Sequence, residues 1–358
     1  MNLGSLKIEP RLEPKLSWQI LSTFLALAMS TIVCALMLNA AGAEVGKAFY
    51  QIYKGAFGSW NATVKTLVMS TPLILTGVAV TIAFHARIWN IGAEGQLFAG
   101  AMTGYWASTL MQNFPAGVVI PVVILAAFIG GALYGGLAGY LKARFAVNEV
   151  LSTVMLNYII RYVLSFLLVG GPWRDPSSFY QQTPKVAEAA HFPLLLSGSR
   201  LHLGFMIAIV AAVAVYFFIN RTSLGYEIRA VGFNPTASRF KGIHVGRTVV
   251  IVMMISGGIA GLAGAGELFG LHFRLKPDIS TGFGFTGIII AMLAGLHPLG
   301  VIAAAVLFGG LVNGGIRMQI FTGVPTAMIS AIEGIILLFF LTSAVLMRYE
   351  IKRVNADG

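Results

Sequence analysis

Apolar runs long enough to cross a lipid bilayer recur along this sequence, and they constrain its fold more than any other feature. A transmembrane helix needs about 20 mostly apolar residues, and runs of that order follow one another from the N-terminal region to the C-terminus. We expect ten spans: 17–38, 66–85, 97–112, 117–141, 150–169, 203–219, 248–271, one on each side of 296–298, and 325–347. The runs do not alternate between apolar and polar residues, so they predict helices rather than a barrel.

The composition excludes a soluble domain. Of the 358 residues 57% are apolar and only 10% are charged, with a mean hydropathy of +0.82, whereas an ordinary globular chain carries roughly 25% charged residues. The net charge of +11 comes mainly from cations in short loops between spans. That distribution is typical of membrane orientation and not of nucleic-acid binding. We therefore expect an all-α, polytopic membrane protein with no nucleic-acid partner.

The longest polar segment lies between two spans, at Asn220–Arg247. It contains five cations (Arg221, Arg229, Arg239, Lys241 and Arg247) and one carboxylate, Glu227. Asn234 can cap a helix whose first residue is Pro235, and Gly242 is suited to the position just past its C-terminus. A short basic helix that exposes Phe240 predicts a docking surface for a partner. The alternative is a solvated loop whose charges only fix the orientation.

An even number of spans places both termini on one side of the membrane. Assigning that side to the cytoplasm puts the dense basic segment inside the cell. This agrees with the enrichment of Lys and Arg in short cytoplasmic loops.

A short repeat indicates internal symmetry. Residues 133–137 (LYGGL) match residues 307–311 (LFGGL). With five spans per half, equivalent helices run in opposite directions, which is the inverted repeat common among transporters. We place the N-terminal half at 1–219, a cytoplasmic coupling loop at 220–247 and the C-terminal half at 248–358, all within one membrane transport domain. Chance similarity between Gly- and Leu-rich helices is the alternative.

Polar residues and glycines interrupt the hydrophobicity between the second and third spans. Asn90, Glu94 and Gln96 are too polar for lipid, and Gly92 and Gly95 allow unwound backbone. One interpretation is a broken helix whose free N–H groups and side chains face a polar solute. The other is a short turn at the cytoplasmic face.

Glu333 lies inside the last span, where a charge costs roughly 2.5–3.5 kcal/mol on insertion scales. We expect it to face the helix bundle, protonated or paired with Arg161, or to contact substrate. Four glycines (Gly257, Gly258, Gly261 and Gly264) predict close helix packing.

The sequence contains no motif for chemistry. It lacks the P-loop pattern for nucleotides, its six histidines show no metal-ligand spacing, and no catalytic triad can be assembled from spacing. We expect no enzyme activity, metal or cofactor on this chain.

Three segments resemble one family of membrane proteins. WNIGAEGQ at 89–96, NEVLSTVMLNY at 148–158 and EIRAVGFNPxA at 227–237 look like the permease subunits of bacterial ABC importers for simple sugars and nucleosides, with branched-chain amino-acid permeases more distant. IGAEGQ at 91–96 differs from the corresponding motif of ribose-type permeases and points to the nucleoside branch. The resemblance covers residues 65–345.

The resemblance implies partners and sites. A separate ATPase subunit, carrying the ATP and Mg, would dock on Glu227, Arg229, Gly232, Asn234, Pro235, Ala237, Arg239, Phe240, Lys241 and Gly242. A second permease, identical or paralogous, would complete the pathway, and a solute-binding protein would deliver the solute. The location would be the bacterial cytoplasmic membrane, with both termini cytoplasmic.

For a nucleoside we expect lining by Trp89, Asn90, Glu94, Gln96, Asn157, Phe283, Asn313 and Glu333, which offer an aromatic face or polar groups. Two alternatives remain. One is a simple-sugar permease, and the other is a proton-coupled secondary transporter that uses Glu333 and Arg161.

Overall fold

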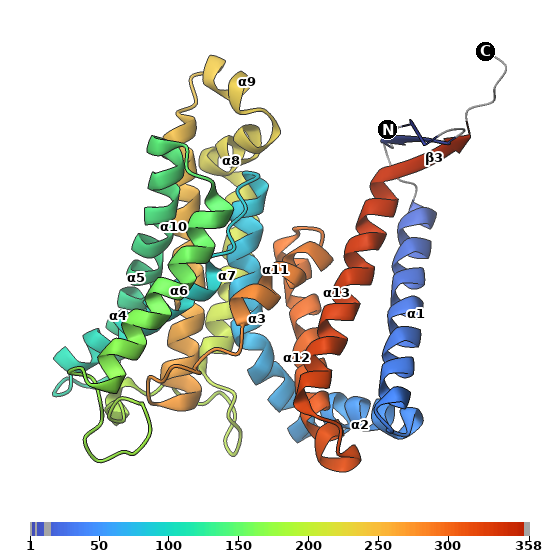
Figure 1. Cartoon of the computed structure of the whole chain (residues 1–358). Coiled ribbons are helices and arrows are strands. Elements are labelled where there is room, and N and C mark those ends of the chain that lie inside the picture. The colour runs from blue at the N-terminus through green and yellow to red at the C-terminus, as the bar shows by residue number, and fades with distance from the viewer. Residues whose placement is uncertain (1, 4–5, 11–15, 354–358) are drawn as a thin grey trace. The chain divides into compact units, whose positions relative to one another are not determined.

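The computed structural model describes residues 2–3, 6–10 and 16–353, and most of them lie in helices (Figure 1). The all-α class is therefore confirmed. The described residues divide into two compact units. The larger unit spans Ala56–Gly310, and the smaller one combines the segments before and after it.

The smaller unit joins the two ends of the described chain. Strand β2 (Leu6–Pro10) pairs antiparallel with β3 (Tyr349–Arg353) on one edge and with the short β1 (Asn2–Leu3) on the other. Helix α1 (Leu16–Ala40) packs against α13 (Thr326–Arg348). Because the strands pair, the segments before α1 and after α13 lie at the same end of this unit (Figure 1).

Helix α2 (Val45–Phe57) follows α1 after a bend of 116° between the helix axes. Gly42 lies in the connecting turn with φ +79°, a conformation that favours glycine. The core of this unit consists of Cys34, Leu38, Ala43, Ala48, Met318, Val324, Ile329 and Ile332.

The larger unit contains the remaining helices. They are α3 (Trp60–His85), α4 (Ala93–Leu110), α5 (Ala116–Phe145), α6 (Glu149–Val169), the short 3-10 helix η1 (Glu188–Ala190), α7 (Leu203–Arg221), α8 (Ser223–Phe233), α9 (Pro235–Phe240), α10 (Val245–Ala265), which continues as the π-helix η2 (Gly266–His272), and α11 (Phe283–Leu293). Helix α12 (Pro298–Thr322) begins in this unit and ends in the smaller one.

Glycines bring α10 into close contact with its neighbours, as predicted. A Cβ atom on Gly257 would lie 2.3 Å from the carbonyl oxygen of Gly131 in α5, and one on Gly264 would lie 2.1 Å from that of Leu97 in α4. Side chains at these positions would force the helices apart. The prediction of small-residue packing in this span is therefore confirmed.

The predicted count of ten spans is not confirmed. Among the described residues six helices are long and apolar enough to cross a membrane, or seven if the bent pair α1–α2 counts as one span. Helix α11 has 11 residues and a length of roughly 16 Å, about half of the hydrocarbon thickness. The span predicted before residue 296 is therefore too short, as a helix, to cross a membrane.

The two copies of the short repeat make similar contacts. A Cβ atom on Gly135 would lie 2.4 Å from the carbonyl oxygen of Met253, and one on Gly309 would lie 2.3 Å from Ser70 Oγ. Close packing alone accounts for glycine at both positions. The inverted repeat and the boundaries at 219 and 248 therefore stay predictions, and the first boundary places six of the ten expected spans in the N-terminal half.

Candidate functional site

The predicted interruption between the second and third spans is a tight connection between α3 and α4. Helix α3 ends at His85, α4 begins at Ala93, and Arg87 in between adopts a left-handed conformation with φ 53°. The connection turns inward, because Asn90 is fully buried and Glu94 and Gln96 are only 2% exposed. Polar side chains this deep in apolar surroundings need hydrogen-bond partners.

Asn90 and Gln96 supply those partners to each other. Asn90 Nδ2 donates to Gln96 Oε1 at 3.0 Å, and Gln96 Nε2 donates to Asn90 Oδ1 at 3.1 Å. Asn90 also donates to Ser256 Oγ in α10 and accepts from the Gly92 N–H. Ser256 Oγ in turn donates to the carbonyl of Ala79 at 2.6 Å. This amide network fixes α3, α4 and α10 to one another.

Asn157 of α6 ties that helix to the same connection. Its Oδ1 accepts from the Gly95 N–H at 2.8 Å, and its Nδ2 donates to the Ile91 carbonyl at 2.9 Å. The expectation that the N–H groups of the break are free to meet a solute is therefore wrong for Gly95. A backbone donor buried beside α6 is satisfied by an amide oxygen instead.

Glu94 stabilises the start of another helix. Its Oε2 accepts a hydrogen bond from the Gly284 N–H at 2.7 Å, in the first turn of α11. A carboxylate at a helix N-terminus satisfies a free donor and interacts favourably with the helix dipole. Phe283 precedes Gly284, and its carbonyl accepts from Thr76 Oγ1 of α3 at 3.0 Å. The structure thus brings Asn90, Glu94, Gln96, Asn157 and Phe283 into one region of the larger unit.

The other three predicted lining residues lie elsewhere. Trp89 is 50% exposed, with its ring 4.9 Å from that of Phe84. Asn313 belongs to the smaller unit and donates to the Gly55 carbonyl at 2.8 Å. Glu333 falls in α13, but its side chain and its predicted pairing with Arg161 lie outside the described part of the structure. Substrate contact at all eight residues stays a prediction.

The short helix predicted in the basic segment is present and follows α8, a helix that the sequence analysis did not predict. Asn234 Oδ1 accepts from the Ala237 N–H at 3.0 Å, Pro235 is the first residue of α9, and the helix ends at Phe240. Gly242 follows with φ +83°. The cap, the first residue and the end of the predicted helix are thus confirmed.

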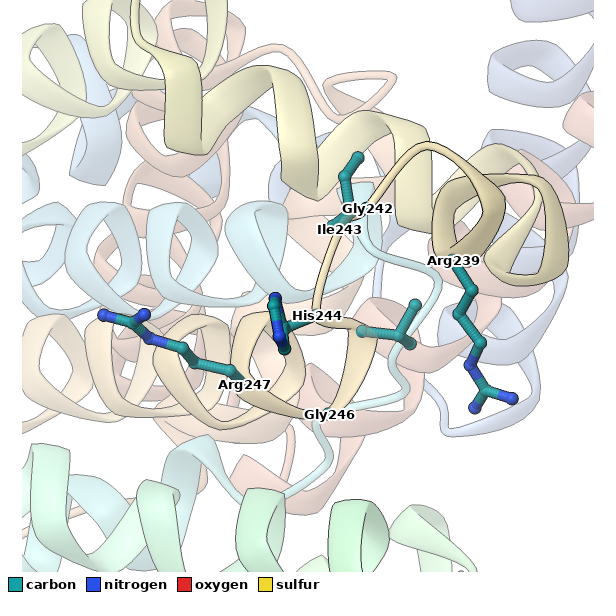
Figure 2. Close-up of a pocket in the computed structure, with 7 residues that line it drawn as sticks. Arg239, Gly242, Ile243, His244, Gly246 and Arg247 are labelled. Carbon is teal, nitrogen blue, oxygen red and sulfur yellow. The ribbon is translucent and has the colours of Figure 1, made fainter.

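Most of the predicted docking residues form the surface of α9 and its flanks. Phe240 is 89% exposed and Phe233 is 79% exposed. Asn234, Pro235, Ala237, Arg239, Lys241 and Gly242 are also exposed, Glu227 and Arg229 are half-buried, and Gly232 is buried. Behind this surface lies an open pocket of about 470 Å³, lined by residues 239 and 242–247 (Figure 2). Within the described residues no carboxylate pairs with Arg239, Lys241 or Arg247.

Gly232 links this surface to the connection between α3 and α4. It lies on the inner side of α8, where an added Cβ atom would come within 2.1 Å of the His85 carbonyl oxygen. A second pocket of about 310 Å³ is lined by both regions, including Ala86, Arg87, Gly232 and Arg239. Movement of α8 and α9 would therefore act directly on the end of α3.

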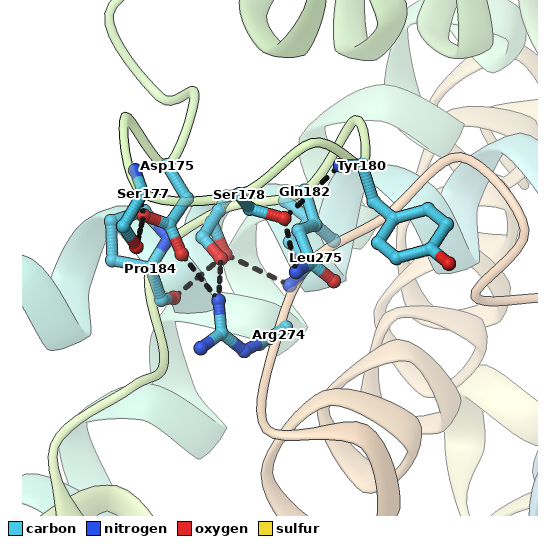
Figure 3. A network of polar contacts seen from close by, with 9 residues as sticks. Asp175, Ser177, Ser178, Tyr180, Gln182, Pro184, Arg274 and Leu275 are labelled. Carbon is cyan, nitrogen blue, oxygen red and sulfur yellow. Dashed lines mark hydrogen bonds and ion pairs between the residues drawn. The ribbon is translucent and has the colours of Figure 1, made fainter.

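The opposite end of the larger unit holds a network that the sequence does not reveal (Figure 3). Asp175 Oδ2 accepts a charge-assisted hydrogen bond from Arg274 Nη1 at 2.6 Å, and its Oδ1 accepts from the backbone and hydroxyl of Ser177. These donors lower the pKa of Asp175 from 3.8 to about 2. The Thr183 N–H donates to the Leu275 carbonyl at 3.0 Å, and the Leu275 N–H donates to Thr183 Oγ1 at 3.0 Å. The loop after α6 is thereby fixed to the segment after η2.

Sequence reasoning also missed a buried acid in η2. Glu267 is only 3% exposed, and its Oε2 lies 3.4 Å from Nε2 of His272. The pair lies five residues apart, and this spacing carries no signal when an ordinary helix is expected, because side chains meet at three or four residues there. The π-helix brings them together.

Comparisons with known proteins identify the family. Residues 62–341 match the family described as the permease component of the branched-chain amino acid transport system. The guanosine ABC transporter permease protein NupP of Bacillus subtilis is 36% identical over 345 residues, covering 95% of this chain and 97% of that protein.

Two further relatives are similar over most of both chains. The glucose ABC transporter permease protein TsgB13 of Haloferax volcanii is 33% identical, covering 80% of this chain and 78% of that protein. The nucleoside ABC transporter permease protein NupB of Lactococcus lactis is 30% identical, covering 95% and 96%. With its family match over most of the sequence and its multi-pass apolar helices, this chain belongs to the family of branched-chain amino acid transport system permease components.

Proposed function

We propose that this chain is the permease subunit of an ABC importer that carries nucleosides across the bacterial cytoplasmic membrane. The observation that carries the proposal is the 36% identity to a guanosine permease over almost the whole of both chains. A second relative named for nucleosides matches over the same extent. ATP hydrolysis then takes place on a separate ATPase subunit, which supplies the ATP and Mg.

The geometry of α8 and α9 supports a mechanism for the coupling. A capped helix that exposes Phe240, Arg239 and, just past its end, Lys241 offers a surface for the ATPase. Because Gly232 of α8 packs on the His85 carbonyl, a push on α9 reaches the α3–α4 connection with no flexible linker between. From there the hydrogen bonds of Asn90 and Asn157 reach α10 and α6.

The same proposal includes the remaining partners. A second permease, identical or paralogous, completes the pathway, and a solute-binding protein delivers the solute at the end of the unit opposite α9. With α9 facing the ATPase in the cytoplasm, both termini are also cytoplasmic. The inverted arrangement of the halves 1–219 and 248–358 belongs to this proposal as well.

Uptake by the purified complex tests the function. The tagged chain, isolated with the subunits that remain bound, is reconstituted in proteoliposomes and supplied with labelled guanosine, uridine, glucose or ribose. We expect uptake of nucleosides that requires internal ATP and is competed by unlabelled nucleosides.

Two outcomes contradict the proposal. ATP-dependent uptake of glucose or ribose alone would favour the alternative of a simple-sugar permease. The Haloferax relative, which is named as a glucose permease, supports that alternative. Uptake driven by a proton gradient without ATP, by this chain alone, would instead show a secondary transporter.

A further inference from the structure

Helix α6 exposes two flanks of different chemistry. Tyr158, Arg161, Tyr162 and Ser165 are spaced by three and four residues, so they share one side of the helix. We call this side the polar flank. The neighbouring flank, with Ile159, Val163 and Phe166, is apolar. Both are open in this chain, since Tyr162 is 73% exposed and Phe166 is 75% exposed.

Arg161 lies near the middle of α6, one of the helices long and apolar enough to cross a membrane. It is the thirteenth residue of a 21-residue helix, so at about 1.5 Å per residue it lies roughly 18 Å from one end and 12 Å from the other. The hydrocarbon core is about 30 Å thick. An arginine that faces lipid at this depth costs at least about 2.5 kcal/mol, and such residues face the interior of a bundle or a water-filled cavity.

The guanidinium is held at this depth and does not extend to the membrane surface. Its carbon lies 6.0 Å from the ring centroid of Phe98 in α4, a cation–π distance. Phe98 lies one helical turn after Glu94 in the same helix. Glu94 in turn binds the start of α11, where Phe283 is half-buried. The polar flank therefore adjoins the region in which the predicted lining residues gather.

The polar flank has open hydrogen-bonding capacity, unlike the amide network. The side chains of Asn90, Gln96 and Asn157 bind one another or the backbone. Among the described residues the hydroxyls of Tyr158 and Tyr162 have no hydrogen-bond partner. A membrane-buried surface of two tyrosines and an arginine is unsuited to lipid and suited to a flat, polar solute.

We propose that the polar flank of α6 lines the solute pathway and contacts the nucleoside in transit. The tyrosine rings stack on the base, and Arg161 donates hydrogen bonds to carbonyl or hydroxyl oxygens of the solute. This inference rests on the proposed function for the identity of the solute, but the presence of water at Arg161 follows from its depth in the span and its charge alone. Asn157 holds this helix against the α3–α4 connection through its two hydrogen bonds.

Thiol labelling tests the exposure to water. The only cysteine, Cys34, is buried, so a Cys34→Ser background is free of other thiols. In the assembled importer we expect Arg161→Cys and Tyr162→Cys to react with a charged, membrane-impermeant methanethiosulfonate reagent. Val163→Cys, one residue further on the apolar flank, is the matched control and is expected not to react. If neither polar-flank variant reacts, the flank is covered by lipid or protein and the proposal is overturned.

Protection and transport test the contact with the solute. Guanosine should slow labelling of Tyr162→Cys, and Tyr162→Ala should raise the KM for guanosine roughly 5-fold or more, the expected effect of losing a base–aromatic stack. Tyr162→Phe keeps the ring and should stay near the wild type. Labelling that guanosine does not slow, together with an unchanged KM, would overturn the contact. Protection by glucose but not guanosine would keep the pathway at α6 and overturn the nucleoside.

Discussion

A single methyl group at Gly232 should reduce ATP-driven uptake without displacing the ATPase. A Cβ atom there would lie 2.1 Å from the His85 carbonyl oxygen and 3.2 Å from Ala86 Cα. Ordinary contacts begin near 3.4 Å, so in Gly232→Ala helix α8 must move away from α3 by more than an ångström. The exposed face of α9 is unchanged by this substitution.

The expected size of the effect follows from packing energies. Forcing an extra carbon into a packed contact costs about 1–3 kcal/mol, and the better helix propensity of alanine offsets up to about 1 kcal/mol. A cost in the upper part of this range, less the full offset, leaves a net loss of about 1–2 kcal/mol, which lowers the population of the coupled arrangement roughly 5- to 30-fold. We expect ATP-driven uptake to fall by that factor while the ATPase still binds.

The assay compares uptake, ATPase binding and thermal stability of the reconstituted complex. Gly246→Ala is the matched control, because it lies in the first turn of α10 and its added Cβ atom would meet only Ala143 Cβ, at 3.6 Å. Uptake by Gly232→Ala at the wild-type rate would refute the mechanical link between α8 and α3. Loss of ATPase binding would show that Gly232 acts at the docking surface instead.

Three further predictions concern stability. Asp175→Asn should speed proteolytic cleavage of the loop after α6 at neutral pH. The wild-type loop should keep its protection down to about pH 4. The reason is that the pKa of Asp175 is lowered to about 2, so the ion pair is lost only as the pH falls through that value. Burial lowers the pKa of His202 from 6.5 to about 4, so the folded state disfavours the charged ring. The free energy of unfolding should therefore fall by about 3 kcal/mol as the pH drops from 6.5 to 4. His202→Asn keeps an acceptor for the Gly204 N–H and should lose most of this pH dependence in thermal melts. Gly257→Val should destabilise the α5–α10 contact by at least about 1–3 kcal/mol, with a lower Tm than Gly170→Ala, where nothing lies within 4 Å of an added Cβ atom.

The sequence predicts best where a local rule decides the structure. The cap at Asn234, the first position of Pro235 and the glycine after α9 depend on neighbouring residues alone, and the structure has all three. The close packing at Gly257 also follows from local spacing, since glycines in an apolar span bring helices together.

The sequence does not show which side chains pair when they lie far apart along the chain. Asp175 and Arg274 are 99 residues apart, and neither stands in a recognisable motif. The same holds for Asn90 and Ser256, which are 166 residues apart. Polar residues within a span indicate that partners exist, but only the arrangement of the helices shows which ones.

The role of a polar residue is also decided by its partners. Glu94 has the polarity expected of a substrate ligand, yet its carboxylate stabilises the start of α11. Gly232 falls within the resembling motif of the basic segment, yet it is buried against α3 instead of forming the surface. In both cases the sequence locates the important segment, and the structure assigns the contact.

The central claim is that a separate ATPase subunit binds α9 and drives transport. Protection of α9 from thiol labelling by that subunit tests this claim most directly. In a Cys34→Ser background, the exposed Ala237→Cys is labelled with a maleimide in the purified complex and after the ATPase has been removed. Ser197→Cys, exposed at the opposite end of the unit, is the control. We predict that the bound ATPase slows labelling of Ala237→Cys at least about tenfold and leaves Ser197→Cys unchanged. Equal labelling of Ala237→Cys with and without the ATPase would contradict the account.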